Sequence, residues 1–131
     1  MMTDPIADFC TRLRNANTNK RKQFTIPAST VKVGIAQVLK DEGFITGYRV
    51  EPQKPQSTLV VDLKYGEDGE HVIRRIVRVS KPGRRVYTGV ADMRPLLRGM
   101  GIRVVSTPKG ILSDRAARSQ KLGGEVLCEV Y

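Results

Sequence analysis

The stretch from Gly101 to Tyr131 restricts the possible folds more than any other part of the sequence. β-Branched residues surround Arg103 over 102–105, which predicts a strand. A compact loop over 106–110 follows, because its Pro fixes φ and its Gly tolerates a positive φ. A tight Gly-Gly turn at 123–124 then leads into a closing strand over 125–131. We therefore expect a small β-rich unit at this end of the chain.

Helical and strand patterns alternate in the first part of the chain. Thr3-Asp4-Pro5 predicts a helix start, since a capping side chain precedes Pro at the first helical position. The buried face of this helix is expected to comprise Ile6, Phe9, Cys10, Leu13 and Ala16. A second helix, capped by Ser29 or Thr30, is expected to direct inward Val31, Ile35, Val38 and Leu39.

Strand patterns flank this second helix. One short strand precedes it at 24–26, and three more follow at 44–51, 58–65 and 72–79. We predict an α+β fold whose N-terminal lobe, residues 1–80, is a helix-strand-helix unit plus a three-stranded meander.

A Pro-Gly turn within 80–85 marks the expected boundary between two lobes, because three cations keep it exposed. Residues 81–131 then form a β-rich C-terminal lobe with short helices. One or two helical turns are expected over 92–99, with Leu96 and Leu97 packed inward. A further short helix is capped by Ser113 or Asp114.

Positive charge is concentrated in one part of the sequence. The formal net charge is +10, and the stretch from Arg74 to Lys121 holds thirteen Lys or Arg against two acids, an excess of eleven. The rest of the chain contains ten Lys or Arg and eleven Asp or Glu. Such asymmetry indicates a polyanionic partner, and the alternative is a solvated basic face.

The sequence offers little for catalysis or metal binding. His71 is the only histidine, and the Ser-Thr loop contains no acid, His or Cys to activate a hydroxyl. Asp92 and Asp114 are expected to cap helices, and Cys10 to act as a small core hydrophobe. We therefore predict no enzyme, no catalytic residue, no metal, no cofactor and no small-molecule substrate. No apolar run approaches the ~20 residues of a membrane span, and we expect a reduced, cytoplasmic protein.

Short hydroxyl side chains suggest how RNA could be distinguished. Ser106 and Thr107 reach only a surface that comes close, which suits the shallow minor groove of A-form RNA. Tyr87 either stacks on a base or sugar or is a core strand residue. Glu125 is able to accept hydrogen bonds from base amino groups. The basic run Lys20-Arg21-Lys22 is either a phosphate contact or merely solvated.

Three separated segments carry a resemblance to a known family. TDPIADFCTRLRNAN, SKPGRRVYTG and VVSTPKGILSDRAARSQKLGGEVLCEVY closely resemble the bacterial-type small-subunit ribosomal protein eight family, over essentially the whole chain. The resemblance implies primary binding to the central domain of 16S rRNA, largely through the C-terminal lobe, in early assembly of the 30S platform. It also implies a location in the small ribosomal subunit beside other subunit proteins. Several bacterial members repress their own operon by binding a messenger stem.

The resemblance also implies which residues contact RNA. They are Ser106, Thr107, Pro108, Lys109, Gly110, Tyr87, Lys81, Arg84, Arg85, Gly124 and Glu125. Secondary contacts are expected from Thr3, Asn15, Lys20, Arg21 and Lys22. Serine is usual in the family at the position of Pro108, so one hydroxyl and one backbone N–H are absent here. The competing classes are a free translational regulator and a small enzyme such as a nuclease.

Overall fold

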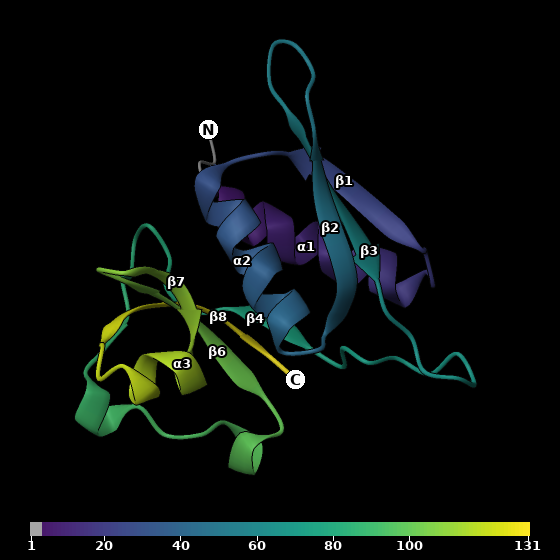
Figure 1. The fold of residues 1–131 in the computed structure, drawn as a ribbon. Coiled ribbons are helices and arrows are strands. Elements are labelled where there is room, and N and C mark those ends of the chain that lie inside the picture. Colours follow the sequence, from purple (N-terminus) through teal and green to yellow (C-terminus); the bar gives the residue numbers. More distant parts are fainter. Residues whose placement is uncertain (1–3) are drawn as a thin grey trace.

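The computed structural model describes residues 4–131. The protein contains two antiparallel sheets, and each sheet packs against helices (Figure 1). The first sheet has the order β1-β3-β2 and comprises β1 (Gln23–Pro27), β2 (Ile45–Glu51) and β3 (Thr58–Leu63). Helices α1 (Pro5–Thr18) and α2 (Thr30–Asp41) pack on it.

The second sheet has the order β4-β8-β6-β7, and β5 also pairs with β8. Its strands are β4 (Ile76–Arg78), β5 (Tyr87–Thr88), β6 (Ile102–Thr107), β7 (Gly110–Ser113) and β8 (Gly124–Val130). Helix α3 (Asp114–Ser119) and the 3-10 turns η1 (Val90–Asp92) and η2 (Leu97–Gly99) complete this part. The predicted α+β class is confirmed.

Helix α1 begins at the residues that the sequence indicated. The Asp4 carboxylate accepts a hydrogen bond from the Ala7 N–H at 3.1 Å, and Pro5 occupies the first turn. Phe9, Cys10, Leu13 and Ala16 are buried as predicted. Thr3 lies outside the described residues.

Helix α2 is capped by Ser29, and Ile35, Val38 and Leu39 are buried as predicted, but Val31 is not. Val31 is 38% exposed, whereas Lys32 is buried beside Ile35 and Leu39. The physical reason is that the Lys32 ammonium donates to the Pro27 carbonyl at 2.8 Å, so a polar residue occupies the inner face with its charge hydrogen-bonded.

The predicted three-stranded meander is wrong in its third strand. Only 76–78 of the expected 72–79 is a strand, and it pairs with β8 in the second sheet. The preceding backbone is engaged elsewhere: Asn17 of α1 donates to the Ile73 carbonyl at 2.8 Å, and the Tyr131 carbonyl accepts the N–H groups of 74 and 75. Since these partners are not on β3, the segment leaves the first sheet.

A buried ion pair ties α1 to the second sheet. Arg78 Nε lies 3.2 Å from both carboxylate oxygens of Asp4, and the two side chains are 8% and 4% exposed. Arg78 also donates to the Leu127 carbonyl of β8 at 2.8 Å. The cap of the first helix is therefore also the partner of a cation held by the last strand.

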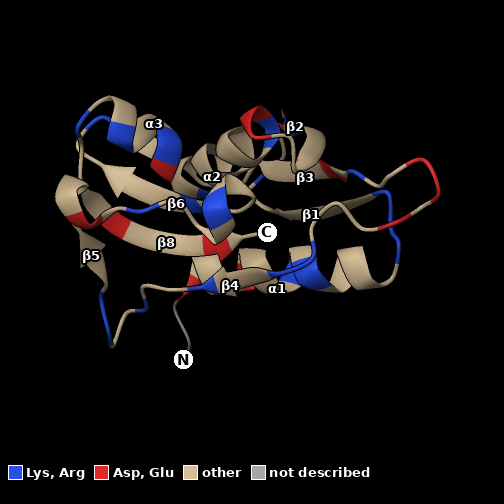
Figure 2. Cartoon of the chain, turned by 90° about the horizontal axis from the view of Figure 1, so that it is seen from below, with Lys and Arg blue, Asp and Glu red and all other residues tan. Residues whose placement is uncertain are grey.

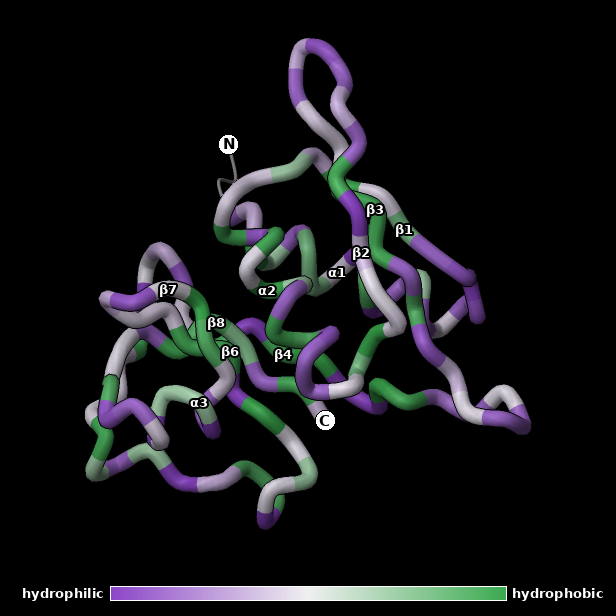
Figure 3. Tube along the Cα trace, in the orientation of Figure 1, coloured by the Kyte–Doolittle hydropathy of each residue, from purple (hydrophilic) through white to green (hydrophobic). Residues whose placement is uncertain are grey.

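One apolar core runs through both sheets. Residues of α1, α2 and the first sheet pack with Ile102, Val104 and Val130 of the second. Figure 3 shows hydrophilic residues gathered at the tip of the β2–β3 hairpin, which projects away from this core. A smaller cluster of Met93, Val105 and Ala117 lies under α3.

Cys10 and Cys128 meet in this core, and both are buried free cysteines. The pKa of Cys128 is raised well above its usual value because its thiol donates a hydrogen bond to Cys10 and is buried. The same hydrogen bond lowers the pKa of Cys10. The predicted role of Cys10 as a buried core residue is confirmed.

Residues 92–101 differ from the prediction. Leu97 is 51% exposed rather than packed inward, because Leu97 and Arg98 adopt left-handed φ values of 48° and 55° that turn the chain outward. Asp92 lies inside η1, and Ser113 rather than Asp114 caps α3. Asp114 instead accepts hydrogen bonds from the Arg103 N–H and the Arg118 guanidinium.

Among residues 4–131 no helix is both long enough and apolar enough to cross a membrane. The division of the chain after residue 80 stays a prediction.

Asp4→Ala should lower the free energy of unfolding by about 3–5 kcal/mol, because it leaves the Arg78 guanidinium buried without its carboxylate and removes the helix cap. Urea denaturation measures the change. The control is Asp8→Ala, whose exposed pair with Arg12 should contribute less than about 1 kcal/mol. Equal losses in the two variants would show that the buried pair does not stabilise the fold.

Candidate nucleic-acid interface

The predicted Ser-Thr loop is a tight hairpin between β6 and β7. Thr107 pairs with Gly110, so only Pro108 and Lys109 form the turn, and the expected five-residue loop is wrong in length. The extra pairing arises because Thr107 Oγ1 accepts from the Lys109 N–H at 3.1 Å and donates to the Gly110 carbonyl at 2.8 Å. Gly110 has a φ of 114°, a backbone conformation that residues other than glycine rarely adopt.

The two hydroxyls of this hairpin have different environments. The Thr107 hydroxyl is engaged within the turn, whereas the half-buried Ser106 hydroxyl has no hydrogen-bond partner among residues 4–131. Pro108, Lys109 and Gly110 are exposed. The hairpin therefore offers the free hydroxyl of Ser106 in β6 and the long cationic side chain of Lys109 at its tip.

Gly124 fixes the position of Ser106. A Cβ on Gly124 would lie 2.0 Å from the Ser106 carbonyl oxygen, far inside contact distance. The residue is glycine because β6 and β8 pass so close to each other here. Its role in the structure is thus to admit the strand that carries Ser106.

Three predicted residues stand in a row across adjacent strands. Tyr87 of β5 pairs with Glu125 of β8, and Glu125 pairs with Ser106 of β6. Directly opposed residues of antiparallel strands point to the same face. Tyr87 is 68% exposed, which excludes the interpretation as a core residue.

Glu125 holds the segment that joins β4 to β5. The Ser80 hydroxyl donates to Glu125 Oε2 at 2.6 Å and accepts from the Val86 N–H at 3.0 Å, and Arg85 lies 3.0 Å from the same carboxylate oxygen. Ser80 is fully buried. Sequence reasoning missed Ser80, because a serine before a Pro-Gly turn gives no sign of a partner 45 residues away.

Lys81 and Arg84 flank the exposed Pro-Gly turn. Their backbones exchange hydrogen bonds of 3.0 and 2.9 Å, and both residues are exposed. In the described part of the chain neither side chain pairs with an acid. The structure thus brings this turn, Tyr87 and Arg85 to the same strand, β8, that supports the β6–β7 hairpin.

Comparison with known proteins shows which family the sequence matches. The family model described as ribosomal protein S8 matches residues 4–131. The chain is similar to small ribosomal subunit protein uS8 of Rhodopirellula baltica, with 55% identity covering 99% of each chain. It is 50% identical to the protein of that name from Finegoldia magna, over the full length of both.

The chain belongs to the ribosomal protein S8 family. Members of this family are structural proteins of the ribosome and not enzymes, in agreement with the sequence analysis. Within the described residues no group of three or more His, Cys, Asp or Glu is arranged to hold a metal ion.

Several arginines of this S8-family chain are engaged in ion pairs rather than free. Arg103 pairs with Glu129 at 2.9 Å, Arg118 with Asp114 at 2.6 Å and Arg115 with Glu42 at 3.4 Å. In contrast, several exposed cations make no ion pair among residues 4–131, namely Lys81, Arg84, Arg94, Arg98, Lys109 and Lys121. Sequence reasoning counted all of them alike because the paired acids are mostly distant in sequence.

The predicted secondary contacts form a separate group at the end of α1. Asn15, Lys20, Arg21 and Lys22 are exposed. The Lys20 ammonium contacts the Gly69 carbonyl and lies 5.3 Å from the centre of the Tyr65 ring, so this cation is partly engaged. Figures 1 and 2 place this end of α1 far from the β6–β7 hairpin.

Gly124→Ala should lower the free energy of unfolding by about 3 kcal/mol, since its methyl group would overlap the Ser106 carbonyl and separate β6 from β8. Gly89→Ala is the matched control, because a Cβ at Gly89 meets nothing within 4 Å. It should change stability by less than about 0.5 kcal/mol in the same urea titration. Equal tolerance of both substitutions would contradict the close approach.

Proposed function

We propose that this chain binds the central domain of 16S rRNA through residues 81–131 and helps to assemble the platform of the 30S subunit. The observation that carries this proposal is the row of Tyr87, Glu125 and Ser106 beside an exposed hairpin and unpaired cations. As a member of its family, the chain is a structural constituent of the small ribosomal subunit and acts in the cytoplasm beside rRNA and other subunit proteins.

Most of the affinity for RNA comes from contacts between exposed cations and backbone phosphates. Lys81, Arg84, Lys109 and Lys121 neutralise the RNA backbone, because they are exposed and make no ion pair in the described residues. Arg85 contributes less than expected from sequence, since its guanidinium already lies 3.0 Å from Glu125.

Specificity comes from the shorter side chains. The Ser106 hydroxyl donates to or accepts from a sugar or a base edge in a shallow groove. The exposed Tyr87 ring stacks on a base or ribose. Glu125 has a second carboxylate oxygen, Oε1, without a hydrogen-bond partner in residues 4–131, and this oxygen accepts from a base amino group.

Pro108 makes the tip of the hairpin different from one that carries serine. It supplies neither a hydroxyl nor a backbone N–H, so the contacts of the tip come from Lys109 and the Gly110 backbone. The rigid turn costs little entropy on binding because Pro108 and the Thr107 hydrogen bonds already fix it.

Two further parts of the proposal concern other RNA. Asn15, Arg21 and Lys22 contact a second rRNA segment at the end of α1, and Lys20 does so only after leaving Tyr65. The surface of the C-terminal lobe also binds a stem in the messenger of its own operon, and rRNA competes for that surface.

Ser106→Ala should reduce the preference for a central-domain RNA fragment over a generic duplex by about fivefold, the value of one lost hydrogen bond. Arg84→Ala should instead weaken both complexes alike and reduce the slope of log affinity against log salt by about one. Filter binding at several salt concentrations measures both effects.

Ser119→Ala, an exposed serine at the end of α3, is the control and should leave both affinities unchanged. The roles assigned to Ser106 and Arg84 would be reversed if Arg84→Ala altered discrimination and Ser106→Ala altered both affinities equally.

A further inference from the structure

An apolar groove lies at the opposite end of β6 from the hairpin. Its volume is about 540 Å³, and its walls include Phe44, Val72, Leu97 and Met100. Phe44 follows α2, whereas Met100 comes just before β6, so the two lobes both contribute. We call this the Met100 groove.

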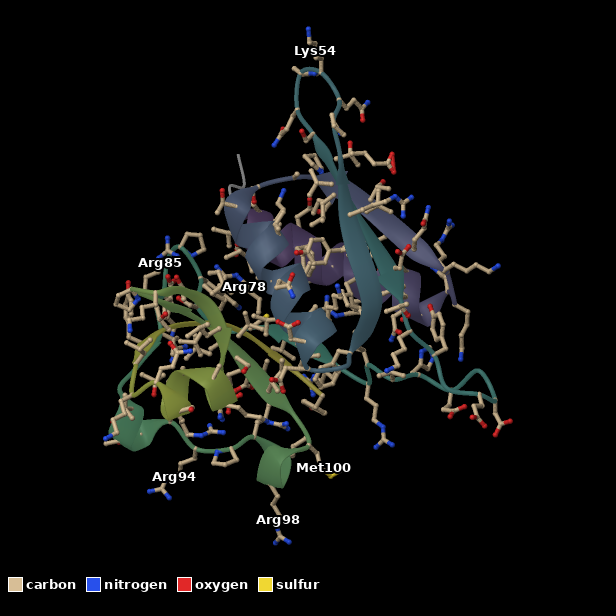
Figure 4. The ribbon with its side chains drawn as sticks, viewed as in Figure 1. Lys54, Arg78, Arg85, Arg94, Arg98 and Met100 are labelled. Atoms are coloured by element: carbon tan, nitrogen blue, oxygen red, sulfur yellow. The ribbon has the colours of Figure 1, made fainter. Side chains whose placement is uncertain are left out.

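Two large apolar side chains of the Met100 groove are exposed to solvent. Leu97 is 51% exposed and Met100 is 76% exposed. Figure 4 shows Met100 and Arg98 pointing away from the body of the protein. Exposed neighbouring apolar side chains in a hollow are typical of an interaction site rather than of isolated surface residues.

The backbone of this segment is strained in a way that maintains the exposure. Leu97 and Arg98 both have left-handed φ, which costs free energy for residues with a Cβ. The Leu96 carbonyl accepts from the N–H groups of Gly99 and Gly101 at 3.0 and 3.1 Å, and Arg115 donates to the Gly99 carbonyl. These contacts fix the turn that directs Leu97 outward.

Charge indicates what kind of partner fits. Arg74 and Arg98 line the groove, and within the described residues neither guanidinium makes an ion pair. No Asp or Glu side chain lines it in that part of the chain. An occupant with carboxylates beside an apolar side chain is therefore complementary in both charge and polarity.

The composition of the groove favours a protein over RNA. Met, Arg, Phe and Tyr line it without any Lys, which is the pattern enriched at protein–protein interfaces. A phosphate backbone would engage the arginines and leave Leu97 and Met100 in water. The candidate RNA surface, in contrast, exposes Lys81, Lys109 and Lys121.

The two surfaces are far enough apart to be occupied together. The groove adjoins the start of β6 at Ile102, and the hairpin follows its end at Thr107. Five steps of a strand span about 17 Å. In Figure 4 Arg85 and Met100 lie at opposite ends of the β-rich part.

We propose that the Met100 groove docks a short segment of a second protein, with a large apolar anchor flanked by Asp or Glu. The anchor packs against Phe44, Leu97 and Met100, and the carboxylates pair with Arg74 and Arg98. Eight residues line the groove, far fewer than the roughly 20–30 residues that each partner contributes to a standard interface, so an isolated segment binds weakly.

The test uses the full chain labelled with ¹⁵N and three synthetic peptides. The first has two leucines flanked on each side by three glutamates, the second replaces the glutamates with lysines, and the third replaces the leucines with serines. The first peptide should shift the amide signals of residues 72–74 and 96–101, and the shifts should reach a plateau as peptide is added. The other two should bind at least tenfold more weakly.

A double variant, Leu97→Ser with Met100→Ser, should weaken the first peptide at least tenfold. Its matched control is Val31→Ser with Val50→Ser, two other exposed hydrophobic residues, 38% and 44% exposed, which should leave peptide binding unchanged. Both double variants should keep the wild-type affinity for the central-domain RNA fragment, which separates this proposal from the RNA-binding one.

Four results would each overturn the docking proposal. The first is the absence of a saturable shift at millimolar peptide, and the second is equal binding of the lysine peptide. The third is loss of RNA affinity in the Leu97→Ser, Met100→Ser variant, which would assign the groove to RNA. The fourth is a concentration-dependent dimer in sedimentation that this variant abolishes, which would make a second copy the occupant.

Discussion

Strand β8 is hydrogen-bonded along one edge to β6 and along the other to β4 and β5. These pairings set where every predicted RNA contact of the second sheet lies. Gly124 lets β6 approach, so that Ser106 stands opposite Glu125, and β5 places Tyr87 on the other side of Glu125. At its middle, β8 receives the Arg78 side chain, which donates to the Leu127 carbonyl and to Asp4, the cap of α1. The exposed surface therefore rests on a strand that cannot shift without breaking the hydrogen bonds of the second sheet and the link through Arg78 to α1.

Charge in this protein serves two purposes that the structure separates. Arg78, Arg103 and Arg118 are engaged with carboxylates and stabilise the fold. Breaking the most buried of these pairs is costly because it leaves an unpaired charge out of water. The exposed cations without acidic partners among residues 4–131 remain available for a polyanion. The net positive charge thus overstates the number of cations available to RNA, and the geometry identifies a smaller set.

The sequence predicted local features well and distant partners poorly. The Asp4-Pro5 helix start, the Ser29 cap and the buried face of α1 follow from side-chain chemistry within one or two turns. The meander failed because the partners of 72–79 are on α1 and β8, distant in sequence. The Ser106–Gly110 segment was recognised as a turn, but the Thr107 hydrogen bonds that shorten it were not apparent. The Ser80–Glu125 contact and the left-handed Leu97 had no sequence signal at all, because both depend on tertiary packing.

Hydrogen–deuterium exchange of the full chain, free and bound to a central-domain RNA fragment, tests the central claim most directly. The proposed mode of binding predicts new protection concentrated at 80–87, 106–110 and 124–125, with weaker protection at 15–22 and none at 96–101. Protection confined to the first sheet or to the Met100 groove, with the hairpin unchanged, would contradict the assignment of RNA binding to the surface built on β8.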